Sequence, residues 1–356
     1  MTPNPYLTRG HIEAHRGEAR AEVAEQAARS LALVAALSRT DLAFRFKGGN
    51  SLLLILEALE RFSIDVDIST GEPRERIEAC LDAAVKESGA FTRWARRQHK
   101  TKPWLPLASF EVYYDSVFPG AGGTFLFFDA QLHKTRYAGQ RVPVRCGELF
   151  ASQETAEVAT PGGILGDKLL TLGPSTYGIP LGKNKEAQRL KHAFDAARLS
   201  RAGPDLKEIR ESLAFCREQE DELQGRSFSM EEALTDTLRL CACPMPFAAP
   251  PAPESVPPAL AEVARGLAPF REHLFSRRYG WAEVQRDFAC AAVCFAAAAA
   301  DGVGEAEFSA ALRAAPGGVL TERFPHNPGA AAMWEAVERW TGRKTEEFLA
   351  PSGSQR

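Results

Sequence analysis

The chain has 356 residues, a formal net charge of -3 and a hydrophobic fraction of 45%. These values are ordinary for a globular protein, and they exclude a basic chain that attracts nucleic acid through its overall field. The longest apolar run, residues 291–300, is too short to span a membrane, and the N-terminus lacks the apolar core of a signal peptide. We therefore expect a cytoplasmic protein, in which the seven cysteines are reduced and mostly buried thiols.

The first two hundred residues mix predicted helices with predicted strands. A helix over 11–38 precedes a short strand over 42–46, a KGGN turn and a buried helix over 51–60, which Asn50 or Ser51 can cap. Strict alternation predicts a strand over 62–68. The remaining predicted elements are a helix over 72–89, strands over 107–117, 123–132 and 141–146, a loop that leads into a helix within 157–172, and a helix over 185–200.

From residue 205 onward the patterns predict helices alone, and the Pro/Ala-rich segment 243–258 is the clearest linker candidate. We therefore predict an α+β fold in which a mixed sheet with flanking helices is followed by a helical C-terminal region.

The predicted strand over 62–68 carries two aspartates, Asp65 and Asp67, on its polar face. Two carboxylates two positions apart on a strand lie about 6–7 Å from each other, and they can converge on one divalent cation or on two. The turn at Gly48 and Gly49 lets the backbone approach a triphosphate closely. A GG turn or a DxD pair is common in ordinary loops, but the two together, with the aspartates in mid-strand, favour a nucleotidyl-transfer site.

The stretch FKGGNSLLLILEALERFSIDVDIS resembles the signature of the AbiEii/MenT nucleotidyltransferases, which are toxins of toxin–antitoxin and abortive-infection systems within the DNA polymerase β-like superfamily. In that signature a lysine precedes GG and the strand has the form R-x-S-x-D-x-D, which Lys47, Arg61 and Ser63 match here. Asn50 stands where a threonine is usual. The resemblance covers about residues 40–200. Together with the helical patterns on either side, it predicts a nucleotidyltransferase domain over 41–202 between an N-terminal helical segment over 1–40 and a helical domain over 203–356.

Two later motifs of the family also have counterparts. ILGDKLLTL supplies Lys168, which could reach a β- or γ-phosphate as a point charge. QRLKHAFDAARL supplies Arg189, Lys191 and Asp195, with His192 at the position of the first aspartate. Lys191 and Asp195 lie four residues apart on one helix face. They are either part of a surface ion-pair ladder, or Asp195 holds the lysine near the triphosphate.

The superfamily places a third carboxylate on a neighbouring strand, as a general base or a shared metal ligand. Glu111 is the first candidate and Asp129 the alternative. The basic segment 93–104 interleaves arginines and lysines with Trp94 and Trp104, which suits either a nucleic-acid strand or a solvated loop.

The resemblance implies an enzyme that uses Mg²⁺ or Mn²⁺ to transfer NMP from an NTP to an acceptor. RNA is the expected acceptor, with the 3′ end of tRNA as one candidate, and a cognate antitoxin is an expected partner. The predicted catalytic residues are Asp65, Asp67, Lys168, Asp195 and Glu111, with both strand aspartates as metal ligands. The predicted nucleotide-binding residues are Lys47, Gly48, Gly49, Asn50, Ser51, Arg61, Ser63 and Lys191. The alternatives are a non-catalytic module that binds a nucleotide or docks a partner, and an enzyme that modifies a protein or a small molecule.

Overall fold

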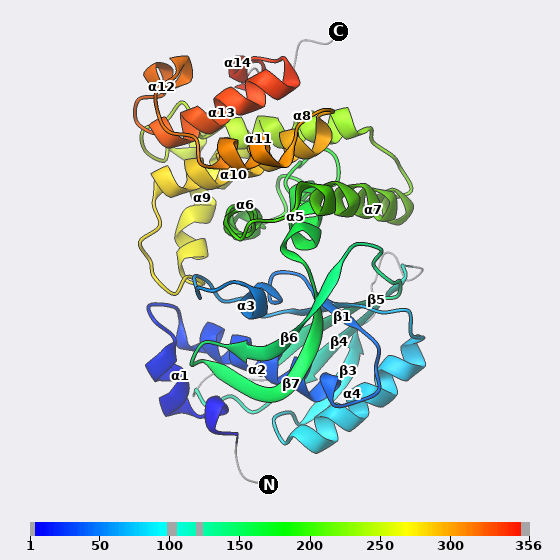
Figure 1. The fold of residues 1–356 in the computed structure, drawn as a ribbon. Coiled ribbons are helices and arrows are strands. Elements are labelled where there is room, and N and C mark those ends of the chain that lie inside the picture. The colour runs from blue at the N-terminus through cyan, green and yellow to red at the C-terminus, as the bar shows by residue number, and fades with distance from the viewer. Residues whose placement is uncertain (1–3, 98–104, 119–123, 350–356) are drawn as a thin grey trace. The chain divides into compact units, whose positions relative to one another are not determined.

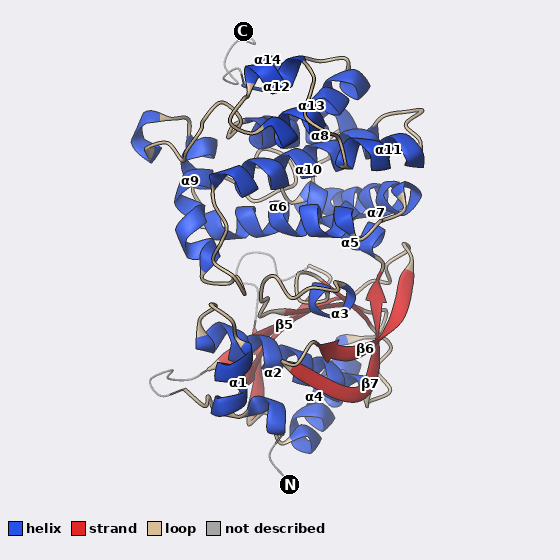
Figure 2. Cartoon of the chain, turned by 60° about the vertical axis from the view of Figure 1, so that its left-hand side comes forward, coloured by secondary structure: helices blue, strands red, loops and turns tan. Residues whose placement is uncertain are grey.

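The computed structural model describes residues 4–97, 105–118 and 124–349. Its contacts divide the chain into two compact units, Met1–Thr160 with Arg271–Arg277, and Pro161–Phe270 with Arg278–Arg356. Strands are drawn only in the first of these units (Figure 2). The sequence predicted a division into residues 1–40, 41–202 and 203–356. The motifs define that division, whereas packing defines the two units of the structure. As a functional division it stays a prediction.

Among the described residues, the first unit is built on a mixed seven-stranded sheet in the order β3-β4-β5-β2-β1-β7-β6 (Figure 1). The strands are β1 (Arg45–Lys47), β2 (Val66–Ser69), β3 (Arg93–Arg97), β4 (Leu107–Tyr113), β5 (Phe125–Gln131), β6 (Gly139–Cys146) and β7 (Phe150–Ala159). β2 pairs with β5, and β1 with β7, in parallel; the other neighbours are antiparallel. Together with the helices this confirms the predicted α+β class.

One face of this sheet is buried and the other is polar. Phe46, Ile68, Phe128 and Phe110 are almost completely buried, and they alternate with partly exposed residues along their strands. Two long helices, α2 (Ala21–Ser38) and α4 (Arg74–Ser88), contact the sheet. Burying an aromatic side chain of this size contributes about 1.5–3 kcal/mol, so the apolar face holds the strands rigidly and leaves the opposite face for polar chemistry.

The remaining elements of this unit are short: η1 (Pro5–Leu7), α1 (Arg9–His15) and α3 (Leu52–Ile55). The helix predicted over 11–38 is two helices, α1 and α2, because the chain turns at Gly17 with φ of +58°. The helix predicted over 51–60 is the single turn α3, which ends where Leu56 becomes extended. Ser51 does not cap it, since its hydroxyl donates to the Gly48 carbonyl instead.

The strand predicted over 62–68 begins only at Val66. Upstream of it, Arg61 forms an isolated bridge with Leu274, and the Phe62 N–H donates to the His273 carbonyl. The backbone there is therefore paired with a distant segment of the chain instead of with a sheet neighbour. Two strands were not predicted: β3 lies within the basic segment, and β7 has polar residues on both faces over its first half, which hides its alternation.

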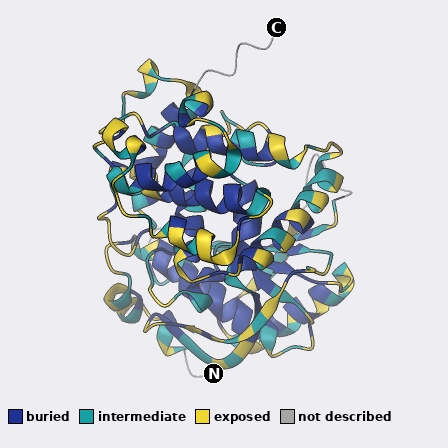
Figure 3. Cartoon of the chain, turned by 45° about the horizontal axis from the view of Figure 1, so that its top comes forward, coloured by how far each residue is buried: buried dark blue, intermediate teal, exposed yellow. Residues whose placement is uncertain are grey.

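The second unit is helical in its described part, which confirms the prediction for residues beyond 205. Its helices are α5 (Pro161–Leu170), α6 (Glu186–Arg201), α7 (Leu206–Gln224), α8 (Met230–Ala242), η2 (Pro253–Ser255), α9 (Pro258–Arg271), α10 (Trp281–Ala299), α11 (Glu305–Leu312), α12 (Val319–Arg323), α13 (Pro328–Thr341) and α14 (Thr345–Leu349). α10 is buried over most of its length and contacts α6, α7, α8 and α13. Figure 3 colours the helices by burial and shows long buried stretches in several of them. The predicted linker connects α8 to α9.

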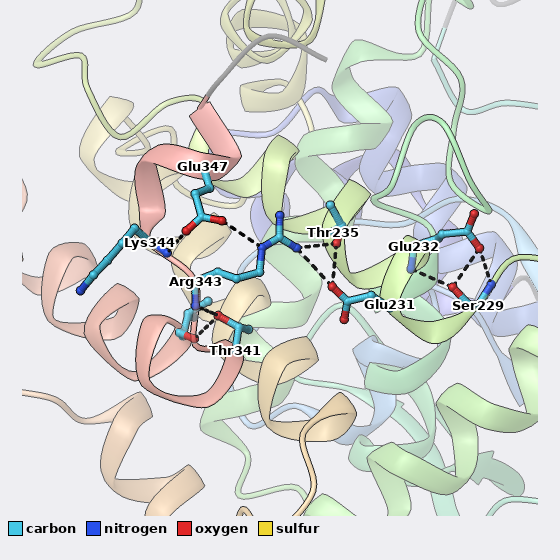
Figure 4. A network of polar contacts seen from close by, with 9 residues as sticks. Ser229, Glu231, Glu232, Thr235, Thr341, Arg343, Lys344 and Glu347 are labelled. Atoms are coloured by element: carbon cyan, nitrogen blue, oxygen red, sulfur yellow. Dashed lines mark hydrogen bonds and ion pairs between the residues drawn. The ribbon is translucent and has the colours of Figure 1, made fainter. Parts of the chain in front are cut away.

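A polar network on the surface of this unit joins α8 to the last helix (Figure 4). Arg343 donates to Glu231 at 3.2 Å, to Thr235 at 2.8 Å and to Glu347 at 3.5 Å. Ser229 and Glu232 form a capping box at the start of α8. Exposed ion pairs of this kind contribute at most about 1 kcal/mol each, so the network orients the last helix more than it stabilises the unit.

The cysteines behave as predicted, since all seven are free thiols and six of them are buried. Burial raises the pKa of Cys146 to about 12, which keeps that thiol protonated. No helix in the described part of the chain has both the length and the apolar character that crossing a membrane requires.

Candidate active site

Five polar side chains form one row across the sheet of the first unit. Lys47 pairs with Asp67, Asp67 with Asp129, Asp129 with Ser109, and Ser109 with Arg97. Directly paired residues on neighbouring strands project to the same face, with Cβ atoms about 4.5–5.5 Å apart. The register therefore sets Asp67 beside a second carboxylate on one side and beside a lysine on the other.

The glycine turn meets this row at Asp67. Gly48 has φ of +70°, a conformation that side chains rarely adopt. A Cβ at this position would lie 2.8 Å from the Asp67 Cγ and would clash with Oδ2 of the same carboxylate. The backbone of the turn and the carboxylate thus approach each other as closely as glycine allows. The structure brings the GG turn and the second strand aspartate together, as the motif spacing suggested.

Asp65 precedes β2 and is half-buried. It lines a cavity of about 260 Å³ together with Ile64, Phe125 and Phe127. Because the strand starts at Val66, the expectation that both aspartates are strand residues is wrong for Asp65. The spacing between the two carboxylates is therefore not set by strand alternation alone.

Of the predicted nucleotide-binding residues, Lys47 belongs to the row and Ser63 lies four residues before Asp67. Lys47 is 7% exposed, and its Nζ donates to Oε1 of Gln131 at 2.9 Å. Gln131 lies two residues beyond Asp129 on β5, so the lysine reaches toward the same face as the carboxylates. Ser63 is half-buried and lies outside any strand.

Three other predicted nucleotide-binding residues are buried. Asn50 is fully buried and its amide donates to Ser30 of α2, while Ser51 is bound to the turn through the Gly48 carbonyl. The Arg61 guanidinium donates to the Phe62 carbonyl at 2.9 Å. Asn50 and Ser51 thus hold the glycine turn from inside, whereas Arg61 binds the backbone beside it.

The two candidates for the third carboxylate have different surroundings. Asp129 pairs with Asp67, whereas Glu111 pairs with Phe127 and lies one strand farther away. Glu111 accepts a hydrogen bond from the Tyr113 hydroxyl at 2.5 Å. Oδ1 of Asp129 is buried and has no hydrogen-bond partner among the described residues. Burying a carboxylate oxygen without a hydrogen-bond donor costs free energy. Such an oxygen therefore indicates a site that a ligand or a proton completes.

The donor set suits a hard cation such as Mg²⁺. No three or more His, Cys, Asp or Glu side chains are gathered as a complete metal site in the part of the chain that the structure describes. Mg²⁺ does not need such a cluster, because it is commonly held by one or two carboxylates together with substrate phosphates. The unpartnered oxygen of Asp129, in register with Asp67, fits a cation that arrives with a nucleotide.

The second unit contains the later motif residues. Lys168 on α5 and Asp195 on α6 form an ion pair at 3.1 Å, and their side chains are 9% and 1% exposed. Because Asp195 is buried, the surface-ladder interpretation of Lys191 and Asp195 is wrong for the aspartate, and the structure gives Lys168 as an ion-pair partner of Asp195. Lys191 is half-buried. Arg189 is completely buried and pairs with Glu262 at 2.9 Å, so it supports the core of this unit.

The basic segment is divided between the two faces of the sheet. Residues 98–104, with Lys100, Lys102 and Trp104, lie outside the described residues. The solvated-loop interpretation is wrong for residues 93–97, which form β3. Trp94 donates from Nε1 to Asp82 of α4 at 2.6 Å, so this ring lies on the helix-covered face.

Comparison with known proteins places these motifs in a family. The model described as "Nucleotidyl transferase AbiEii toxin, Type IV TA system" matches residues 31–275, more than half of the chain. Among solved structures, the chain is similar to MenT4, a nucleotidyltransferase toxin from Mycobacterium tuberculosis H37Rv. The two share 16% identity over 80% of this chain and 94% of that chain, with a TM-score of 0.46. A comparison with curated proteins returned no match.

Gly48→Ala tests the contact between the glycine turn and Asp67. We expect at least about a tenfold loss of affinity for Mg²⁺–NTP, measured by calorimetry with each of the four nucleotides, because the new methyl group displaces the carboxylate. Gly147→Ala is the matched control, since Gly147 also has positive φ but has open space where a Cβ would lie. Equal losses in the two variants would show that backbone strain, not the contact with Asp67, is responsible.

Asp195→Asn tests the buried pair of the second unit. We expect the free energy of unfolding to fall by about 3–5 kcal/mol, because Lys168 is left charged and buried. The control is Glu211→Gln, which removes one partner of the exposed Lys207–Glu211 pair and is expected to cost less than about 1 kcal/mol. Urea denaturation of the full chain measures both, and comparable values would refute a buried pair.

Proposed function

The chain belongs to the AbiEii nucleotidyl transferase toxin family, and from this membership we propose that it uses Mg²⁺ or Mn²⁺ to transfer NMP from an NTP to an RNA acceptor. The observation that carries the proposal is the row in which Asp67 lies against the Gly48 turn and beside Asp129, whose Oδ1 has no partner among the described residues. Such a row combines the two requirements of the reaction, a place for phosphates and a place for their cation.

Asp65 and Asp67 would hold the cation, which supplies charge neutralisation at the reacting phosphate. The backbone amides around Gly48 and Gly49 would contact phosphate oxygens, because a glycine turn lets the chain approach them closely. Lys47, paired with Asp67 across the strands, adds a positive charge on the same face. These groups position the triphosphate and balance its charge, and that accounts for most of the catalysis that phosphoryl transfer needs.

In the reaction the acceptor hydroxyl oxygen forms a bond to the α-phosphorus, the bond from that phosphorus to the bridging oxygen breaks, and pyrophosphate leaves. The hydroxyl proton needs a base. We assign this role to Asp129 in place of Glu111, because Asp129 pairs with Asp67 and its Oδ1 has no hydrogen-bond partner among the described residues, while Glu111 accepts a hydrogen bond from Tyr113.

Lys168 would neutralise the charge that develops on pyrophosphate. Asp195 holds the Lys168 ammonium group in place through an ion pair at 3.1 Å. Asp195 is thus proposed as a positioning residue for Lys168. Lys191, half-buried on the same helix as Asp195, is proposed as an additional phosphate contact.

Family membership also supports the cellular part of the proposal. The enzyme would act in the cytoplasm, where RNA and nucleotides are available, and arrest growth until a cognate antitoxin relieves it. The 3′ end of tRNA is one candidate acceptor. A protein or a small molecule as acceptor, and a non-catalytic nucleotide-binding module, are the competing functions.

Incubating the full chain with Mg²⁺, total RNA and each α-labelled NTP tests the activity. We expect label in RNA with at least one NTP, and a loss of roughly 100-fold or more in the Asp65→Ala, Asp67→Ala double variant and after chelation of the metal. Transfer that survives the double substitution would remove the metal-site assignment. Label in protein would favour the protein acceptor, and tight Mg²⁺–NTP binding without transfer would favour the module.

Asp129→Asn and Glu111→Gln separate the two candidates for the general base. Both changes keep the shape of the side chain and remove its charge. We expect kcat to fall by about 10²–10⁴-fold for Asp129→Asn and by less than about tenfold for Glu111→Gln. Melting temperatures control for folding, and the opposite order of the two kcat values would return the role to Glu111.

A further inference from the structure

The sheet face that carries the row continues into a surface of aromatic rings and arginines. The paired residues Arg93, Tyr113 and Phe125 form one line across β3, β4 and β5. Phe127 lies between Phe125 and Asp129 along β5, and Arg97 belongs to the row itself. Alternation along the strands places all of them on the face of Asp67 and Asp129. We call this set the aromatic–arginine surface: Arg93, Arg97, Tyr113, Phe125 and Phe127.

The members of this surface touch one another. The ring centroids of Tyr113 and Phe125 are 5.5 Å apart, and those of Phe125 and Phe127 are 5.1 Å apart. The Arg93 guanidinium lies 3.4 Å from the centroid of Tyr113, and that of Arg97 lies 4.4 Å from the centroid of Phe127. The surface is therefore continuous: Arg93 lies over the ring of its paired residue on β4, and Arg97 reaches across β4 to a ring on β5.

These residues are available to a ligand. The three rings are partly exposed and both arginines are exposed, whereas Phe110 and Phe128 on the opposite face are almost completely buried. Within the described residues, neither Arg93 nor Arg97 has a carboxylate partner. The surface thus offers two guanidinium planes, each laid over a ring, and the partly exposed ring of Phe125, with the Glu111 carboxylate on the same face.

The cavity beside Asp65 adjoins this surface, because Phe125 and Phe127 line both. Its volume of about 260 Å³ is below the roughly 300–1,000 Å³ of pockets that enclose a drug-sized ligand. It suits a single ring system rather than a complete nucleoside triphosphate. One flat ring in the cavity would lie next to a predicted metal ligand and against aromatic walls.

We propose that the cavity and the aromatic–arginine surface bind the last unpaired nucleotides of the acceptor strand, an inference that rests on the proposed transfer to RNA. The terminal base enters the cavity at Asp65, and the preceding bases stack on the rings and guanidinium planes. Arg93 and Arg97 pair with the phosphates between them. The terminal hydroxyl is thereby held on the same sheet face as Asp67 and Asp129.

The dimensions of the surface favour a strand over a mononucleotide. Neighbouring strands are about 4.8 Å apart, and residues i and i+2 on a strand lie about 6–7 Å apart. From Phe125 to Asp129, and across to β3, the surface is larger than one base. Unpaired bases stack on aromatic side chains without regard to sequence, whereas in a duplex their faces are covered. An acidic peptide would use the arginines but not the rings.

Binding of a fluorescein-labelled ten-nucleotide single-stranded RNA to the full chain, followed by anisotropy without NTP, tests the proposal. For Phe127→Ala we expect a loss of about 5- to 150-fold, the range for removing one base–aromatic stack, and near wild-type binding for Phe127→Trp. Arg97→Met is expected to weaken binding and to reduce its salt dependence. The control is Arg145→Met on β6, which removes the same charge from an exposed site and is expected to change binding less than about twofold.

Three results would each overturn the proposal. The first is that Phe127→Ala and Arg97→Met bind the RNA as the control variant does. The second is that a duplex of equal length binds as tightly as the single strand, and the third is that a polyglutamate peptide displaces the labelled RNA as well as unlabelled RNA does. Melting temperature and Mg²⁺–NTP affinity, both expected to be unchanged in Phe127→Ala, show that the variant is folded.

Comparing RNA binding with NMP transfer in the surface variants and the wild type separates this proposal from the proposed function. Loss of RNA binding in the surface variants, with no transfer from any NTP in the wild type, supports the surface and contradicts the transferase role on RNA. Transfer to RNA that is unaffected by the surface variants supports the transferase and contradicts the acceptor surface.

Discussion

The close approach of the Gly48 backbone to the Asp67 carboxylate is the constraint on which the site depends. It requires a left-handed residue without a Cβ directly after β1, and a carboxylate on β2 in register with Lys47. Both requirements are met only if β1 and β2 are held firmly, and the buried residues Phe46 and Ile68 hold them from the opposite face. Packing on the apolar face therefore fixes the two strands, and this positions the groups on the polar face.

Local sequence predicted the parts of this arrangement that depend on neighbours along the chain. The glycine turn, the polar position of Asp67, helix α4 and helix α6 all follow from patterns within about twenty residues. The limits of β2 do not, because the backbone of Arg61 and Phe62 pairs with residues 273–274. No pattern near residue 61 contains that partner, so alternation over 62–68 predicted a longer strand than the chain forms.

The third carboxylate shows the same limit at the level of register. Alternation correctly separates Glu111 and Tyr113 from Val112, and it separates Asp129 from Phe128. It does not say which residue of β5 lies opposite Asp67, since that depends on a parallel pairing between strands some sixty residues apart in the chain. Once the register is known, Asp129 becomes the neighbour of Asp67 and Glu111 lies a strand farther away.

Aromatic residues are favoured in strands for packing alone, so their presence on β4 and β5 needs no function. Phe110 and Phe128 fit that account, because they stack on each other in the core. Phe125, Phe127 and Tyr113 do not, since they lie on the polar face, partly exposed, and carry two guanidinium groups that have no carboxylate partner among the described residues. Aromatic rings and two guanidinium groups without a carboxylate partner among the described residues favour a ligand that brings both bases and phosphates, which a core-packing explanation does not require.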